Sequence, residues 1–246
     1  YLTTKNTKFL KSDNIKALCI INNEKLWIGT FTNGVSIYNL KTKEFEPNPF
    51  PDRLITFLKN VGVLSIVQYD ENHVLLGTNY KGLVKYNINK HTFKIFDSNT
   101  KPKGITNNNV KTVKVDSKKN IWVGTLSGLN MISTKGEITK YIYESEAKVK
   151  FEINTIFEDK NNVLWIGTFE DGLFKFEDNK FESIDLKIGE TEVNGIRSIV
   201  EAENNTFWVS TYTQGLLKYN PKQNKIVSYY TNKEGLISNQ FNRDAS

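Results

Sequence analysis

Cationic and amide side chains recur at one position of a repeated pattern, and they are the residues best placed for chemistry. The pattern is apolar, variable, small, apolar, as in Ile15-Lys16-Ala17-Leu18. The variable position holds Lys16, Leu64, Lys111, Asn154 and Arg197 in the five copies. Ammonium and guanidinium groups bind carboxylates and sulfates through charge-assisted hydrogen bonds. Gathered together, these side chains would bind an anionic ligand; pointing into solvent, they would bind nothing.

A motif of the form Trp-Ile-Gly-Thr, followed by another glycine, defines the repeat that carries these positions. Its copies occupy residues 27–30, 75–78, 122–125, 165–168 and 208–211. Equivalent residues are 43 to 48 positions apart. A period of this length is typical of repeat architectures, in which each unit buries an apolar face against its neighbour. The second copy departs from the motif, with Leu75 and Leu76 in place of Trp and Ile.

Each repeat predicts four short antiparallel strands. In the fourth copy, strands are expected at 153–157, 163–168, 173–176 and 180–184. The turn at Asp159-Lys160-Asn161-Asn162 separates the first two, and Gly172 precedes the third. Asp and Asn favour turns because their side chains bond nearby backbone groups, and glycine accepts a positive φ. Four-stranded units with this period are blades of a β-propeller.

The chain is therefore predicted to be all-β, a single β-propeller domain over residues 1–246. Its full blades are expected at about 11–60, 61–107, 108–150, 151–193 and 194–232, with partial blades at both ends. This arrangement indicates a ring of more than five blades, and seven is the expected number. The first strand of each blade is expected to line the channel, because small side chains recur there. Residues 53–59 are predicted to form one or two helical turns.

Connections rich in amides supply the second set of candidate binding residues. They are Asn107, Asn108, Asn109, Asn194, Asn239 and Gln240. These connections are expected on the same face as the first-strand cations, where amides could bind sugar hydroxyls. Loops on a rigid scaffold commonly carry binding residues. Asn-rich turns also occur without any ligand, so both interpretations stay open.

Composition argues against several other kinds of site. The net charge is +6 with scattered lysines, so direct nucleic-acid binding is not expected. No apolar run approaches the ~20 residues of a membrane span. Cys19, the only cysteine, is predicted to pack as a small hydrophobe. His73 and His91 are the only histidines and have no Cys or carboxylate cluster beside them. No metal, cofactor or catalytic residue is therefore predicted.

The prominent residues of the motif have a functional and a structural interpretation. The four tryptophans could stack on sugars, but their place in mid-strand favours packing between blades. The motif threonines are expected to form structural hydrogen bonds rather than to act as nucleophiles. Turns that begin at Asp70, Asp116 and Asp159 lack the alternating acidic ligands of a calcium loop, so turn capping is predicted.

Residues 153–176, with their Asp turn, Leu-Trp-Ile-Gly-Thr and Gly-Leu-Phe-Lys-Phe, resemble the two-component regulator propeller repeat. The other four units resemble it too, and residues 235–242 look like the segment before the last blade in such proteins. The resemblance implies the periplasmic sensor region of an inner-membrane-anchored hybrid two-component system. In such systems two propellers precede a β-sandwich, a membrane helix and a histidine kinase. The resemblance also implies that an oligosaccharide controls glycan-utilisation genes. The repeat occurs with other output domains as well.

Three hypotheses for function follow. In the first, the chain is an extracytoplasmic propeller that binds an oligosaccharide without catalysis, an acidic one if the cations take part. Its partners would be that glycan, a neighbouring propeller of the same chain and a second protomer in a homodimer. In the second, it is a protein-interaction propeller with the ligand bound elsewhere. In the third, it is a propeller lyase or hydrolase, against which the shortage of histidines argues.

Overall fold

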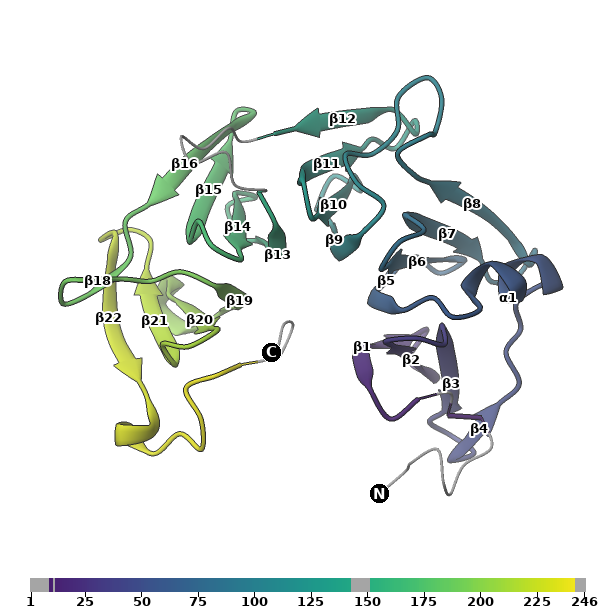
Figure 1. Cartoon of the computed structure of the whole chain (residues 1–246), viewed down its shortest axis with the longest axis horizontal. Helices are drawn as coiled ribbons and strands as arrows, with labels where there is room; N and C mark the ends of the chain where they lie inside the picture. The colour runs from purple at the N-terminus through teal and green to yellow at the C-terminus, as the bar shows by residue number, and fades with distance from the viewer. Residues whose placement is uncertain (1–8, 11, 143–150, 242–246) are drawn as a thin grey trace. The chain divides into compact units, whose positions relative to one another are not determined.

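Five antiparallel sheets of four strands each, with one two-stranded hairpin, make up the part of the chain that the structure describes. The computed structural model describes residues 9–10, 12–142 and 151–241. The strands of each sheet are ordered as in the sequence, so every sheet is a meander (Figure 1). The predicted fold class, an all-β chain built of four-stranded propeller blades, is confirmed.

The strands lie where the repeats place them. Blade one has β1 (Ile15–Ile21), β2 (Lys25–Thr30), β3 (Val35–Asn39) and β4 (Glu44–Glu46). Blade two has β5 (Val63–Asp70), β6 (His73–Thr78), β7 (Leu83–Asn87) and β8 (Thr92–Phe96). Blade three has β9 (Val110–Val115), β10 (Ile121–Thr125), β11 (Gly128–Ile132) and β12 (Ile138–Tyr141). Blade four has β13 (Ile153–Glu158), β14 (Leu164–Thr168), β15 (Leu173–Glu177) and β16 (Lys180–Ile184). Blade five has β19 (Ile196–Glu201), β20 (Phe207–Thr211), β21 (Leu216–Asn220) and β22 (Lys225–Tyr230).

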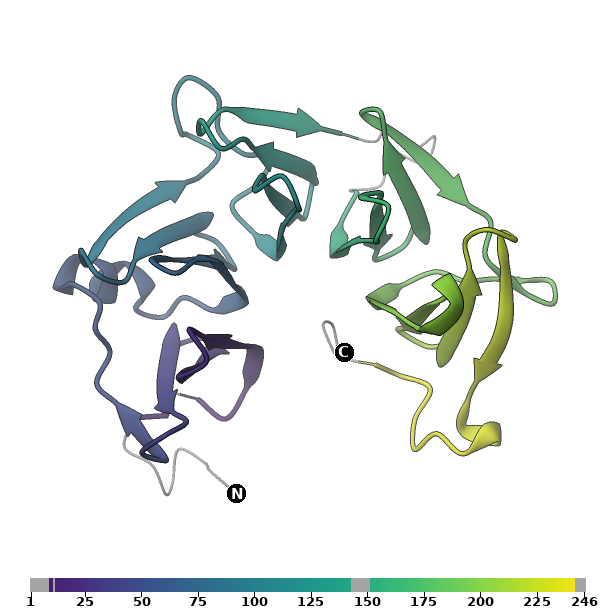
Figure 2. The same ribbon diagram turned by 180° about the vertical axis from the view of Figure 1, so that it is seen from behind.

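The chain divides into two compact units. The first comprises Tyr1–Thr125 and Asn130–Lys140, and the second comprises Leu126–Leu129 and Tyr141–Ser246. In the first unit, β1 packs beside β5 and β5 beside β9 (Figures 1 and 2). In the second, β13 packs beside β19. First strands are thus neighbours within each unit. The predicted single ring and its blade number stay predictions.

The motif glycine permits this close packing of first strands. Gly29 pairs across the sheet with the small residue Ala17. A Cβ atom at Gly29 would lie 2.6 Å from the carbonyl oxygen of Val63, on the first strand of the next blade. At Gly167 a Cβ atom would lie 2.5 Å from Cγ2 of Ile196. The small residue of the first strand and the motif glycine therefore serve the same purpose, which is to keep the interface between blades thin.

The motif threonine ties the turn between the second and third strands. In blade two, the Thr78 hydroxyl donates to the carbonyl of Gly82 at 2.7 Å and accepts the backbone N–H of Lys81 at 2.9 Å. Thr30, Thr168 and Thr211 make the same bond to a glycine four residues later. The predicted structural role of these residues is confirmed. In blade three, where the turn is one residue shorter, Thr125 bonds the Thr106 hydroxyl at 2.8 Å.

The motif tryptophan packs between blades. Trp27, Trp122 and Trp165 are buried, and Trp165 lies edge-on to Phe207 of blade five with ring centroids 5.0 Å apart. The Asp of the first turn fixes the indole: Asp159 Oδ2 accepts from Trp165 Nε1 at 3.0 Å. Asp116 does the same for Trp122 at 2.8 Å. Trp27 lies 6.2 Å from the ring centre of Tyr86 in blade two, so the predicted packing between blades is confirmed for Trp27 and Trp165. Trp208 is only half-buried.

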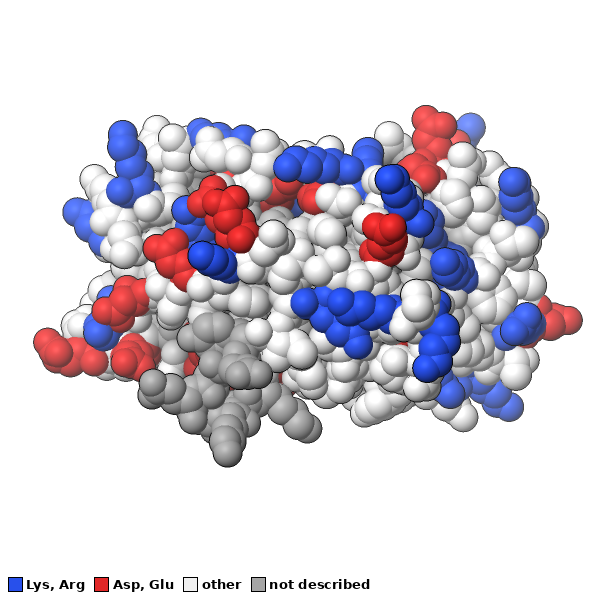
Figure 3. Space-filling model, turned by 90° about the horizontal axis from the view of Figure 1, so that it is seen from above, with Lys and Arg blue, Asp and Glu red and all other residues white. Residues whose placement is uncertain are grey.

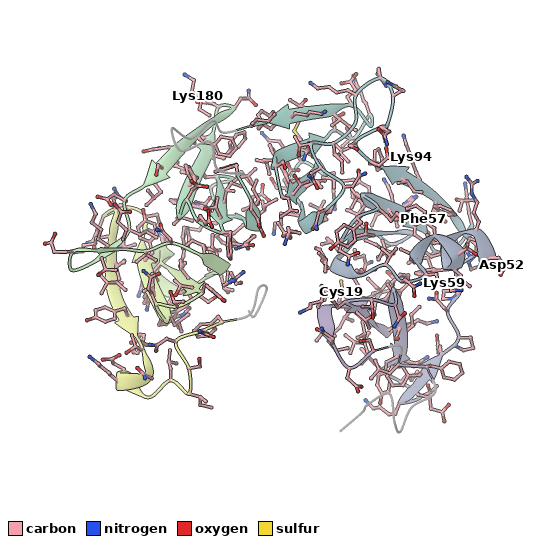
Figure 4. The ribbon with its side chains drawn as sticks, in the orientation of Figure 1. Cys19, Asp52, Phe57, Lys59, Lys94 and Lys180 are labelled. Carbon is pink, nitrogen blue, oxygen red and sulfur yellow. The ribbon has the colours of Figure 1, made fainter. Side chains whose placement is uncertain are left out.

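Short elements outside the blades occupy the connections. The predicted helical segment forms α1 (Asp52–Leu58), which buries Leu54 and Leu58 and carries Asp52 and Phe57 (Figure 4). The remaining elements are the hairpin of β17 (Lys187–Ile188) with β18 (Thr191–Glu192) and the 3-10 turns η1 (Glu203–Asn205) and η2 (Asn232–Glu234). Cys19 lies on β1 and packs against the core cluster of blades one and two, as predicted (Figure 4). Burial raises the pKa of its thiol.

Candidate functional site

The five variable positions of the first strands share a backbone feature that the sequence did not reveal: each is the extra residue of a β-bulge. In blade one, Ile15 pairs with Thr30 and Ala17 with Gly29, which leaves Lys16 without a cross-strand partner. The same irregularity falls at Leu64, Lys111, Asn154 and Arg197. A bulge re-aims a side chain and is common beside functional sites. The side chains of the variable residues therefore do not follow the regular alternation of the strand.

In the first unit, these residues differ in their surroundings. Lys16 is half-buried, and its Nζ atom lies 5.3 Å from the centre of the Phe31 ring. Lys111 is also half-buried, whereas Leu64 is buried and apolar. Phe31 directly follows the motif threonine and is 42% exposed. Blade one thus presents a cation over an aromatic ring that solvent can reach.

Asn154 has a packing role in the second unit. Its side chain is fully buried, and Nδ2 donates to the carbonyl of Ile196 at 3.0 Å. This bond joins the first strands of blades four and five at the bulge. The Oδ1 atom is buried without a hydrogen-bond partner among the described residues. Asn154 therefore links two blades through a buried hydrogen bond and does not contact solvent.

Arg197 is the candidate residue with the most developed surroundings. Its guanidinium carbon lies 4.4 Å from the centre of the Tyr212 ring and 5.3 Å from that of Phe169. The two rings are 6.1 Å apart. Asn194 lies three residues before Arg197 in the same connection, and the carbonyl of the intervening Gly195 accepts the backbone N–H of Tyr212 at 2.8 Å. We call Phe169, Arg197 and Tyr212 the Arg197 cluster.

The electrostatics of the Arg197 cluster favour an anionic ligand. Arg197 is half-buried, and its Nε atom is buried with no hydrogen-bond partner in the part of the chain that the structure describes. Burial lowers the pKa of the guanidinium, and the nearby Tyr212 and Glu152 oppose this shift. A guanidinium stays charged at neutral pH despite such a shift. Stacking uses its faces and leaves its donor edge for a planar anion.

The amide-rich connections mainly form hydrogen bonds with backbone groups of the chain. The carbonyl of Asn108 accepts the N–H of Gly82 at 2.9 Å, and that of Asn239 accepts the N–H of Gly215 at 3.0 Å. Asn107 Oδ1 accepts the N–H of Asn109, which is itself buried. Asn108 and Asn239 each therefore bond the turn between the second and third strands of a blade to the connection that follows that blade.

Asn194 and Gln240 are the exposed amides of this set. With its amide nitrogen turned toward them, Asn194 donates to the carbonyls of Val193 and Glu170 at 3.3 Å each. The backbone N–H of Gln240 donates to Ser238 Oγ at 3.0 Å. Of the predicted amides, Asn194 is the one that precedes Arg197 in the same connection, three residues before it.

Sequence reasoning missed the aromatic residues of the site. Phe31, Phe169 and Tyr212 each follow the motif threonine directly, in three of the five repeats. Tyr80, two positions after Thr78, is 67% exposed. The signal was present as an aromatic residue just past an otherwise uniform motif. The role of this aromatic residue could not be predicted without the bulge, which turns the cation of the first strand toward the ring.

Other kinds of site find little support in the described residues. No group of three or more His, Cys, Asp or Glu side chains among them could hold a metal ion. His73 bonds Asp70 through Nδ1 at 2.9 Å and Asn87 through Nε2 at 3.0 Å, so its ring is held on both sides. Lys and Arg lie among Asp and Glu on the face seen in Figure 3, in keeping with a mildly basic surface. No helix in the described ranges is long and apolar enough to cross a membrane.

Comparison with known proteins identifies the repeats. Residues 104–127 and 152–170 match the model of the two-component regulator propeller family. The resemblance drawn from the repeated motif is confirmed by the match at these two segments. The chain is also 34% identical over 259 aligned residues to histidine kinase P4 of Formosa agariphila. The match covers all of this chain and 18% of the length of that kinase.

Solved structures with the same fold include an extracellular domain and a lyase. One is the extracellular domain of the hybrid two component system BT3049 from B. thetaiotaomicron, with a TM-score of 0.77 and 18% identity. The alignment covers 98% of this chain and 32% of that one. Another is virginiamycin B lyase from Staphylococcus aureus, with a TM-score of 0.65 and 15% identity, covering 90% of this chain and 70% of the lyase. At these identities the likeness establishes the propeller fold alone.

Proposed function

We propose that this chain is a ligand-binding propeller of a sensor histidine kinase and that it recognises an acidic oligosaccharide through the Arg197 cluster. The observation that carries the proposal is the position of Arg197, on a bulge, with its guanidinium over Phe169 and Tyr212. A cation stacked on two aromatic rings matches a sugar that bears a carboxylate or sulfate. The rings would pack against the apolar face of the sugar, and the guanidinium edge would bind its anion.

The whole-protein features extend this proposal. The similarity to a histidine kinase supports a kinase elsewhere in the full-length protein, and the similar extracellular domain supports a periplasmic location for this propeller. We further propose that the ligand controls glycan-utilisation genes, that the chain works beside a neighbouring propeller, and that the full-length protein is a homodimer. In this account the propeller binds its ligand without chemistry.

Calorimetric titration of the chain with matched neutral, uronate-containing and sulfated oligosaccharides tests the proposal. We expect the acidic oligosaccharides to bind and their neutral counterparts to bind at least tenfold more weakly, since one charge-assisted bidentate contact contributes about 1.5–3 kcal/mol. Arg197→Gln should remove this preference and Arg197→Lys should retain part of it. Lys111→Gln, which removes a cation from the corresponding bulge of blade three, is the matched control. Equal binding by wild type and Arg197→Gln would refute the assignment of the site.

A further inference from the structure

A cavity of about 440 Å³ lies between blades four and five of the second unit, apart from the Arg197 cluster. Blade four contributes Asp159, Trp165 and Glu182, and blade five contributes Asn205, Tyr219 and Asn224. The volume falls within the range of small-molecule sites and suits one sugar residue or two. Both blades supply polar groups, so the cavity belongs to the interface rather than to a single sheet.

The floor of this cavity is held rigidly. Asp159 is 8% exposed and accepts three hydrogen bonds, from the indole of Trp165 and from the backbone N–H groups of Asn161 and Val163. Tyr219 is buried and donates its hydroxyl to Asn224 Oδ1 at 2.8 Å. These bonds fix the side chains against which a ligand would rest. A preformed floor reduces the entropy lost on binding.

The exposed residues at the rim of the cavity carry polar groups that are available for hydrogen bonds to a ligand. Asn161, Asn205 and Glu182 are exposed, and their side chains form no hydrogen bond within the described ranges. Asn224 uses its oxygen for Tyr219 and keeps its amide nitrogen available. The rim therefore offers amide donors, amide acceptors and one carboxylate to a bound molecule.

The equivalent cavity between blades one and two provides a comparison within the same chain. Its volume is about 300 Å³, and Trp27, Ile37 and His91 are among its lining residues. Here the exposed lining amides already form hydrogen bonds: Asn22 Nδ2 donates to the carbonyl of Glu71 at 3.1 Å, and Asn89 Nδ2 donates to Asn72 Oδ1. The interface between blades four and five thus retains hydrogen-bonding groups that the corresponding interface in the first unit uses internally.

The lining also indicates the chemistry of the ligand. Asp159 and Glu182 balance Lys175 and Lys222, so the lining has no net charge to offset the desolvation of a charged ligand. Mixed donors and acceptors suit hydroxyl groups, which both donate and accept, while Val163 and Ile184 offer an apolar surface for ring C–H groups. From this combination we infer that the cavity between blades four and five binds a neutral sugar residue, independently of the acidic ligand of the Arg197 cluster.

Nuclear magnetic resonance of the ¹⁵N-labelled chain tests this inference. Methyl glycosides of neutral hexoses are added, with methyl glucuronide as the charged comparison. We expect the indole signal of Trp165 and the side-chain amide signals of Asn205 and Asn224 to move with the neutral glycosides, and to move much less with the glucuronide. Signals that stay fixed, or that move equally with the glucuronide, would overturn the inference.

Two exposed neighbours provide a matched pair of variants. Asn204 and Asn205 both have φ near 58°, so glycine is accepted at either place, but only Asn205 lines the cavity. Asn205→Gly combined with Glu182→Gln should weaken neutral-glycoside binding about tenfold, from the loss of two hydrogen bonds. Asn204→Gly and Arg197→Gln should leave it unchanged. If Arg197→Gln abolished neutral-glycoside binding, the neutral sugar would be bound at the Arg197 cluster, and the inferred second site would be wrong. If acidic oligosaccharides failed to bind while neutral glycosides still did, only the proposed function would be refuted.

Discussion

Replacing Asp159 by alanine should destabilise the chain mainly through one orphaned hydrogen-bond donor. Asp159 Oδ2 accepts from Trp165 Nε1 at 3.0 Å, and both residues are buried. Removing the acceptor leaves the indole N–H unsatisfied between blades four and five, which costs about 1–3 kcal/mol. Oδ1 also accepts the N–H groups of Asn161 and Val163, and losing these turn bonds adds about 1 kcal/mol. The expected total is about 2–4 kcal/mol.

A double-mutant cycle separates these two contributions. Urea unfolding, followed by circular dichroism, is measured for wild type, Asp159→Ala, Trp165→Phe and the double variant. Phenylalanine removes the donor, so Asp159→Ala in that background should lose only the turn bonds. The coupling energy should therefore be about 1–3 kcal/mol. Asp185→Ala, at an exposed carboxylate paired with Lys187, is the control and should change stability by less than about 1 kcal/mol. Additive effects of Asp159→Ala and Trp165→Phe would refute the reasoning.

Blades one and two already contain partial versions of this change. In blade one, Ile21 occupies the position of the Asp, and Trp27 Nε1 is buried with no partner among the described residues. In blade two, Tyr69 and Leu75 replace the Asp and the Trp together. The fold therefore tolerates the loss of one such bond, and the predicted effect of Asp159→Ala is a shift in stability rather than failure to fold.

Three further predictions concern the motif and the pH dependence. Gly29→Ala should lower the free energy of unfolding in urea by about 1–3 kcal/mol, because the added Cβ would lie 2.6 Å from the carbonyl oxygen of Val63. Ser210→Ala, at the same motif position in blade five, is the control and should leave that free energy nearly unchanged. Thr78→Val should cost about 1–2 kcal/mol by losing the bonds to Gly82 and Lys81, and Thr78→Ser should restore most of it. Burial disfavours the Asp70 carboxylate, but hydrogen bonds from His73 and Asn72 outweigh it and hold its pKa below the ordinary value. Its stabilising contribution is thus present above about pH 4 and lost as the pH falls further, so wild type and Asp70→Asn should converge in urea midpoint at acidic pH. A difference that persists or grows at low pH would show that the carboxylate is not the group responsible.

The architecture could be predicted because it depends on features that recur along the chain. Strand alternation, Asx turns and a glycine at fixed spacing place each blade, and Gly29 or Thr78 has the same task in its own repeat. The Asp of the turn was correctly assigned to capping. Its second bond, to Trp165, was not foreseen because it depends on how the first turn folds back over the second strand.

The candidate site was less predictable because it depends on departures from the repeat. Lys16, Asn154 and Arg197 occupy the same sequence position and the same bulge, yet one lies over an aromatic ring, one is buried between blades and one lies over two rings. The difference comes from the residues beyond the motif threonine and from the neighbouring blade. Neither is visible in the pattern of the first strand alone.

The side chain of Arg197 itself offers the most direct test of the proposed function. The chain contains three arginines, Arg53, Arg197 and Arg243, so the Nε–H signals can be assigned by substitution. On addition of an acidic oligosaccharide selected by calorimetry, the account predicts a large shift of the Arg197 Nε–H signal and none for Arg53. The neutral counterpart of the same oligosaccharide should leave the Arg197 signal in place. Tight binding of the acidic oligosaccharide with an unchanged Arg197 signal would contradict the central claim.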